Sequence, residues 1–132
     1  MGDRLRIADT SFLYALFSET DELHAKAVSE AGKADALSIP SEILSETLSL
    51  VHRGQGFQAA RATGDWIRAQ ANIEMCTPSK PIIEDTWRIF MSGAGKLSYP
   101  DSVVIAHCRA LDAKPLTFDR TILAHEKKKP KA

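Results

Sequence analysis

Short apolar segments alternate with longer amphipathic segments along this chain, and two of the short segments are followed closely by an aspartate. Residues 5–8 form a mainly apolar run that stops at Asp9, and residues 115–117 form another that leads to Asp119. Apolar runs of this length are typical of buried strands, whereas the intervening segments show the 3.6-residue periodicity of helices. Strands that alternate with helices predict an α/β fold with a short, mainly parallel sheet flanked by helices.

Apolar periodicity, prolines and glycines place the other elements. Two more strands are expected at residues 36–39 and 72–75. Thr20 is the expected N-cap of the second helix, and Pro40 is expected to open the third. The helices are expected at residues 11–17, 20–32, 40–53, 57–71, 78–90 and 100–111.

Length and composition limit the function classes that remain open. A chain of 132 residues fits one domain, which we place at residues 1–124, with residues 125–132 as a basic, disordered tail. Lys plus Arg and Asp plus Glu number 17 each, whereas proteins that hold nucleic acid by bulk electrostatics are clearly basic. Any contact with nucleic acid must therefore be local or bridged by metal ions.

The expected location follows from absent signals. No run approaches the roughly 18 apolar residues of a membrane span, and the N-terminus lacks a secretory signal. Cys76 and Cys108 are too few for a disulfide framework. We therefore expect a cytoplasmic protein without a membrane partner.

Asp9 and Asp119 are the first candidate site residues. The carboxyl ends of parallel strands meet at one edge of a sheet, where ligands commonly bind. Two carboxylates at that edge repel each other unless a positive charge lies between them. The competing interpretation is that each aspartate only caps the helix that follows it.

Asp101 and Glu46 are expected on the inner rims of two helices. Val104, Ile105 and Cys108 lie three, four and seven residues after Asp101, on the same helix face. A bare carboxylate at such a position is costly, although Ser98 and Asp101 also have the spacing of a capping box. Glu46 borders an apolar face in the same way, and its alternative is a solvated glutamate packed by its stem.

Four acids from four elements predict a site for hard divalent cations, which prefer oxygen ligands. Such a site fits metal-assisted hydrolysis of phosphodiesters. Other chemistries lack their motifs: residues 92–96 do not complete a Walker A loop, because Phe90 stands where a glycine is required. The four histidines show no zinc spacing, and Ser11 replaces the second aspartate of haloacid-dehalogenase-type phosphatases.

Five segments of the chain resemble the motifs of one family, the PIN-domain nucleases. Residues 7–13 look like the opening motif, and residues 21–27 are similar to the D-x-x-H-x-x-A stretch of VapC-type toxins. Residues 43–47 resemble the second motif, which supplies a glutamate. Residues 97–101 match the L-S-x-x-D third motif, and residues 116–120 match the L-T-F-D-R fourth.

The resemblance spans about residues 5–122 in the family's order. It implies a PIN fold, a three-layer sandwich, and an Mg²⁺- or Mn²⁺-dependent endoribonuclease that is often the toxin of a toxin–antitoxin pair. The metal ligands would then be Asp9, Glu46, Asp101 and Asp119. A hydroxyl of Ser11 or Thr117 would support them, and a cognate antitoxin and a second copy of the chain would be partners.

One departure and one alternative accompany this interpretation. Many relatives continue into a final edge strand after the fourth motif, whereas residues 124–132 are polar and lysine-rich here, so that strand is expected to be missing or very short. The alternative function is a non-catalytic PIN-like module that binds RNA or a protein. The intact set of acids favours the nuclease, because a scaffold gains nothing from clustering repelling carboxylates.

Overall fold

The computed structural model of the chain describes residues 5–127. Four strands and seven helices alternate along it. They are β1 (Leu5–Ala8), α1 (Thr10–Phe17), α2 (His24–Lys33), β2 (Ala36–Pro40), α3 (Ser41–Gln55), α4 (Phe57–Ala69), β3 (Ile73–Cys76), α5 (Lys80–Gly93), α6 (Tyr99–Leu111), β4 (Lys114–Leu116) and α7 (Arg120–Lys127). The predicted α/β fold is confirmed.

The four strands form one parallel sheet in the order β3-β2-β1-β4. Ile7 of β1 is in register with Ser38 of β2 on one side and with Pro115 of β4 on the other. Because the strands are parallel, the segments that follow β1 and β4 leave the sheet at the same edge. Asp9 and Asp119 belong to these two segments.

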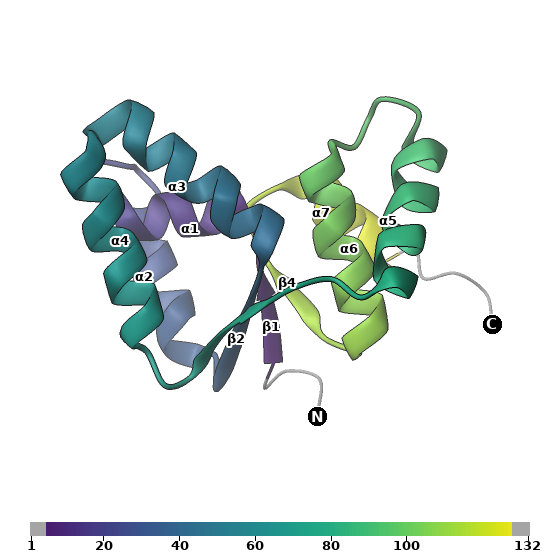
Figure 1. Cartoon of the computed structure of the whole chain (residues 1–132), viewed down its shortest axis with the longest axis horizontal. Helices are drawn as coiled ribbons and strands as arrows, with labels where there is room; N and C mark the ends of the chain where they lie inside the picture. Colours follow the sequence, from purple (N-terminus) through teal and green to yellow (C-terminus); the bar gives the residue numbers. More distant parts are fainter. Residues whose placement is uncertain (1–4, 128–132) are drawn as a thin grey trace.

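Two groups of helices cover the sheet (Figure 1). Helices α1 to α4 lie on one side of the central strands, and α5 to α7 lie on the other. The contacts follow this division, since α3 packs on α4 and α1 packs on α2 and α3, whereas α5 and α7 both pack on α6. The arrangement is the expected three-layer sandwich.

The core lies between these layers and holds the central strand in place. Ile7 and Ala8 of β1 have no exposed surface, and Phe12, Ile39 and Ile43 are equally buried around them. Burying such side chains contributes about 1.5–3 kcal/mol each, so the ends of β1 are firmly positioned. The segment that starts at Asp9 therefore follows a fully buried strand end.

The second helix begins later than the sequence predicts. Helix α2 starts at His24, and its N-cap position is occupied by Leu23, not by Thr20. The carboxylate of Asp21 accepts a hydrogen bond of 2.8 Å from the backbone N–H of Leu23, which stabilises a turn in place of a first helical turn. The His24 ring donates to the backbone oxygen of Ala15 at 2.9 Å and thereby ties α2 to α1.

The segment after Asp119 forms a helix, whereas many relatives continue into an edge strand at this point. Residues 120–127 form α7, which packs on α6 and β4. No strand follows Asp119 within residues 5–127. Residues 125–127 of the expected tail therefore belong to α7, and residues 128–132 lie outside the described part of the chain. Within residues 5–127, none of the helices has both the length and the apolar character needed to span a membrane.

Candidate active site

Asp9 is held at the carboxyl end of β1 by two hydroxyl groups. Its side chain is only 3% exposed, and its Oδ2 accepts hydrogen bonds from Thr117 Oγ1 at 2.7 Å and from Ser11 Oγ at 2.8 Å. Although Asp9 occupies the N-cap position of α1, its side chain makes no capping hydrogen bond. The interpretation of Asp9 as a helix cap is therefore wrong, because its carboxylate accepts from the hydroxyl groups of Ser11 and Thr117 and from no backbone N–H of α1.

The same two hydroxyl groups also hold the segment that follows β4. Ser11 Oγ accepts a hydrogen bond from the backbone N–H of Phe118 at 3.1 Å, and Thr117 Oγ1 accepts one from the N–H of Asp119 at 2.9 Å. The Asp119 carboxylate in turn accepts from the N–H of Thr121 at 2.8 Å. The segments after β1 and β4 are thus one hydrogen-bonded unit that brings Asp9 and Asp119 to the same edge.

Asp101 approaches this edge from the first turn of α6. The predicted capping box is present: Asp101 N–H donates to Ser98 Oγ, and Ser98 N–H donates to Asp101 Oδ2, both at 3.1 Å. Burial raises the pKa of the Asp101 carboxyl, and the carboxylates of Asp119 and Asp9 raise it further, against the lowering effect of the Ser98 hydrogen bonds. Three carboxylates from three elements therefore lie close enough to repel one another.

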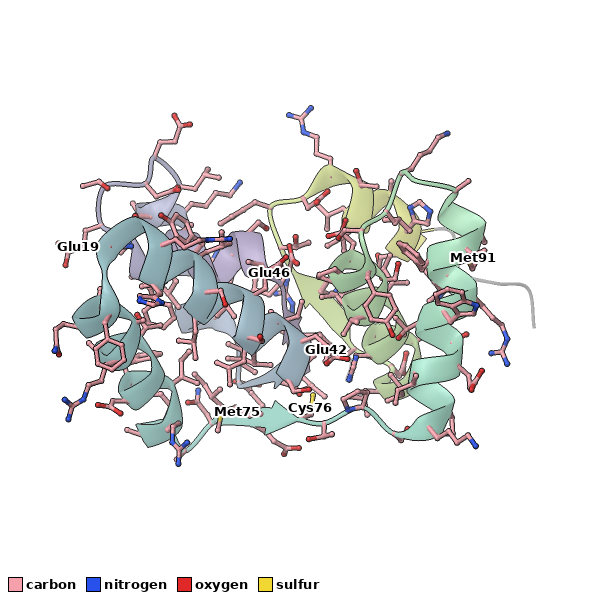
Figure 2. All side chains as sticks on the ribbon, turned by 45° about the horizontal axis from the view of Figure 1, so that its top comes forward. Glu19, Glu42, Glu46, Met75, Cys76 and Met91 are labelled. Carbon is pink, nitrogen blue, oxygen red and sulfur yellow. The ribbon has the colours of Figure 1, made fainter. Side chains whose placement is uncertain are left out.

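Glu46 reaches the site from the opposite layer. It lies on α3 and accepts a hydrogen bond from the hydroxyl of Thr10, the residue after Asp9. Figure 2 shows Glu46 near the middle of the molecule, between α3 and the helices of the other layer. Glu46 is half-buried and hydrogen-bonded to Thr10, so it is a positioned side chain and not a freely solvated one.

Thr10 is a residue of this site that sequence reasoning missed. The supporting hydroxyl groups were sought at Ser11 and Thr117, and both contact Asp9 as described. The role of Thr10 depends on the placement of Glu46, which lies 36 positions away. Its only sequence signal is its place directly after Asp9, where a small hydroxyl residue faces the same edge.

The donor set suits a hard divalent cation, although it is not assembled as a closed cage. Within residues 5–127, no three Asp, Glu, His or Cys side chains are close enough together to hold a metal ion as they stand. None of the ion pairs among these residues involves one of the four acids. Within residues 5–127 the site is therefore a group of oxygen donors that form no ion pair with a basic side chain, and Mg²⁺ and Mn²⁺ prefer oxygen donors of this kind.

Comparison with known proteins gave one family match and several structural matches. The PIN domain family profile matches residues 6–128. No curated protein matches the chain. The residue range of the family match includes all four acids.

Three solved structures share the fold. VapC20 of Mycobacterium tuberculosis, described as a sarcin-ricin loop cleaving toxin, has a TM-score of 0.80 and 24% identity, covering 92% of this chain and 94% of its own. VapBC2 of Rickettsia felis, bound to a DNA fragment from its promoter, has a TM-score of 0.69 and 13% identity, with coverages of 91% and 92%. A protein of Pyrobaculum aerophilum has a TM-score of 0.60 and 21% identity, with coverages of 96% and 89%.

Proposed function

The chain belongs to the PIN-domain family, and on that premise we propose that it is a metal-dependent endoribonuclease. The observation that carries the proposal is the juxtaposition of Asp9, Asp119 and Asp101 at one edge of the sheet, with Glu46 joined to it through Thr10. Like charges in a partly buried site are unfavourable unless a cation binds between them. Divalent cations at such a site assist the hydrolysis of phosphodiesters, and the family match and the likeness to VapC20 support RNA as the substrate.

The metal would be held by Asp9, Glu46, Asp101 and Asp119. A bound Mg²⁺ or Mn²⁺ would supply Lewis-acid stabilisation of the phosphate and an activated water. The hydroxyl groups of Ser11 and Thr117 orient Asp9 by donating to its Oδ2. Both donors lie on that one oxygen, so within residues 5–127 the other oxygen of Asp9 accepts no side-chain hydrogen bond and would be available to a metal ion.

Orientation is the main contribution of the remaining residues. The Thr10 hydroxyl holds Glu46 against the segment after β1, and the capping box holds Asp101 in the first turn of α6. A carboxylate that is held in place by a hydrogen bond loses less conformational freedom when it binds a metal. The chain therefore prepares the ligands on rigid elements from both layers of the sandwich.

The biological role proposed for the enzyme is that of a toxin. The likeness to VapC20 supports this role, because that protein is described as a toxin that cleaves the sarcin-ricin loop. A toxin of this kind would act in the cytoplasm and would be paired with a cognate antitoxin, and a homodimer is the proposed assembly. The likeness to VapBC2 supports the antitoxin as a partner.

Cleavage of labelled single-stranded and stem–loop RNA tests the proposal. We expect cleavage with Mg²⁺ or Mn²⁺, none in excess EDTA, and recovery when the metal is returned. Asp101→Asn should lower the rate on the order of a hundredfold or more, because a ligand charge is lost. Asp85→Asn is the matched control, since Asp85 pairs with Arg88 on the surface of α5.

Each outcome has a defined meaning. Cleavage that persists in chelator would reject the metal mechanism. If Asp101→Asn cleaves RNA at the same rate as Asp85→Asn, Asp101 only caps its helix and does not contribute to catalysis. RNA binding without cleavage under all metal conditions would support the non-catalytic module instead.

A further inference from the structure

The ammonium group of Lys26 lies beside the candidate active site. Lys26 is an exposed residue of α2, and its Nζ is 5.7 Å from the centroid of the Phe118 ring. Phe118 lies between Thr117 and Asp119, in the segment after β4. The quadrupole of an aromatic ring attracts a cation that lies over its face. This attraction favours the observed position of the Lys26 ammonium group over the other positions that the flexible side chain can adopt.

The aromatic platform under Lys26 is itself fixed to the acidic centre. The half-buried ring of Phe118 packs on the fully buried Phe12, with ring centroids 5.9 Å apart. The backbone N–H of Phe118 donates to Ser11 Oγ, and the same hydroxyl donates to Asp9. Lys26 is therefore connected to the carboxylate of Asp9 through its contact with the Phe118 ring and through two hydrogen bonds, from Phe118 to Ser11 and from Ser11 to Asp9.

Within the described part of the chain, Lys26 forms no ion pair with an acidic side chain. Lys33 on the same helix, by contrast, pairs with Glu30 at 3.7 Å. An arginine of the same layer, Arg61, is less well placed to contact a substrate at this site. Arg61 pairs with Asp65 on α4, and α4 packs on α3 at the outer side of the molecule (Figure 1).

A polyanion that approaches four carboxylates needs positive charge near them. Bound metal would offset the charge at the reacting phosphate, but the adjacent phosphates of an RNA strand would still face an acidic surface. A lysine binds phosphate as a compact point charge, and its flexible stem tolerates different backbone positions. The net charge of zero makes a local contact of this kind more important than it is in a basic protein.

We infer that Lys26 is a substrate-positioning residue that binds a backbone phosphate of single-stranded RNA next to the scissile one, with the Phe118 ring holding its ammonium group in place. The inference rests on the proposed ribonuclease function and adds a named contact to its substrate. Because the contact is to the backbone, it positions the strand and does not select its sequence.

Steady-state cleavage of a labelled single-stranded RNA in Mg²⁺ tests the inference. Lys26→Met keeps the apolar stem and removes the charge, so KM should rise about three- to tenfold while kcat stays within about twofold. The slope of log KM against log KCl concentration should fall by about 0.7, the value for one lost contact to a single strand. Lys26→Arg should restore both values, because arginine keeps the charge and the ring contact.

Lys33→Met is the matched control, since it removes the same charge from the same helix. It should leave KM and the salt slope at their original values, and thermal unfolding should show that all three variants are folded. If Lys26→Met behaves like Lys33→Met in KM and slope, the inference is overturned, and the lysine only packs α2 on the segment after β4.

A binding measurement separates this inference from the proposed function. If the natural chain cleaves no RNA, the ribonuclease proposal fails, and fluorescence anisotropy with the same RNA then decides the role of Lys26. Weaker RNA affinity in Lys26→Met than in Lys33→Met would still support the phosphate contact. Equal affinities would overturn it.

Discussion

The hydroxyl of Thr117 donates a hydrogen bond of 2.7 Å to Oδ2 of Asp9, across 108 positions of sequence. The contact exists because β1 and β4 are neighbours in the sheet, where the N–H of Asp9 also donates to the backbone oxygen of Leu116 at 3.0 Å. The segment that follows β4 therefore orients the carboxylate that follows β1. Disturbing either segment should disturb the proposed metal site.

Thr117→Val tests this relationship with a side chain of nearly the same shape. A hydrogen bond to a charged acceptor contributes about 1.5–3 kcal/mol, so the free energy of unfolding should fall by an amount in that range. RNA cleavage should fall about tenfold, because Asp9 loses part of its orientation. Urea unfolding and initial cleavage rates measure the two effects.

Thr86→Val is the control for the loss of a buried hydroxyl. Thr86 is 1% exposed and donates only to the backbone oxygen of Ile82, one turn away on α5. It should affect stability but not cleavage. Equal cleavage by Thr117→Val and Thr86→Val would contradict the proposed role of Thr117.

Asp101→Asn should stabilise the metal-free protein while it removes activity. The pKa of Asp101 is raised in the folded state, chiefly by burial and then by Asp119 and Asp9. The folded state therefore binds the proton more tightly than the unfolded state, and stability falls as pH rises from the ordinary aspartate value of about 3.9 through the raised value. At pH 7.5 the charged form costs stability, and the neutral asparagine does not.

Urea unfolding in EDTA checks the sign of this effect. The midpoint of Asp101→Asn should exceed that of the natural chain at pH 7.5, and the difference should shrink as the pH is lowered towards 4. A lower midpoint for the variant at pH 7.5 would show that the capping box with Ser98 outweighs the burial of the charge.

Gly93→Ala should destabilise the turn that leads to Asp101. A Cβ at position 93 would lie 3.2 Å from two side-chain carbons of Leu97, which is 2% exposed and cannot move freely. Overpacking lowers the free energy of unfolding by about 1–3 kcal/mol, and the better helix propensity of alanine offsets about 1 kcal/mol of this loss. We therefore expect a net loss of about 1 kcal/mol, measured by urea unfolding.

Gly32→Ala is the matched helical control. A Cβ at position 32 in α2 meets nothing within 4 Å, so alanine should stabilise the chain by about 0.5–1 kcal/mol. If both glycine variants change stability by the same amount, the contact with Leu97 does not limit position 93.

The two thiols should be poor nucleophiles in the folded chain. Burial raises the pKa of Cys108 to about 12, with a further contribution from Glu126, and burial also raises the pKa of the half-buried Cys76. Because the thiolate is the reactive form, alkylation by iodoacetamide at pH 8 should be much slower than in urea, most of all at Cys108. Peptide mass spectrometry measures each rate, and rapid labelling of Cys108 in the folded chain would contradict the prediction.

Local sequence signals determined the fold class, the order of the elements and the capping box of α6. Apolar periodicity is a local property, and so are the spacing of Ser98 and Asp101 and the short runs before Asp9 and Asp119. Where local signals compete, the sequence is less decisive. Thr20 is of a residue type that commonly occupies the N-cap position. The turn at Asp21 and the contact of His24 with α1 nevertheless make the helix begin several residues later.

The side-chain contacts of the site were decided only by the tertiary structure. The carboxylate of Asp9 accepts a hydrogen bond from Thr117 and makes none to the backbone N–H groups of its own helix. Thr10 donates to Glu46, and Lys26 lies over Phe118. Thr10 and Glu46 are 36 positions apart in the sequence, and Asp9 and Thr117 are 108 positions apart. Such distant residues meet because of the strand order β3-β2-β1-β4. Periodicity indicates which residues face a core or an edge, whereas strand order determines which edge residues become neighbours, and that order results from packing of the whole chain.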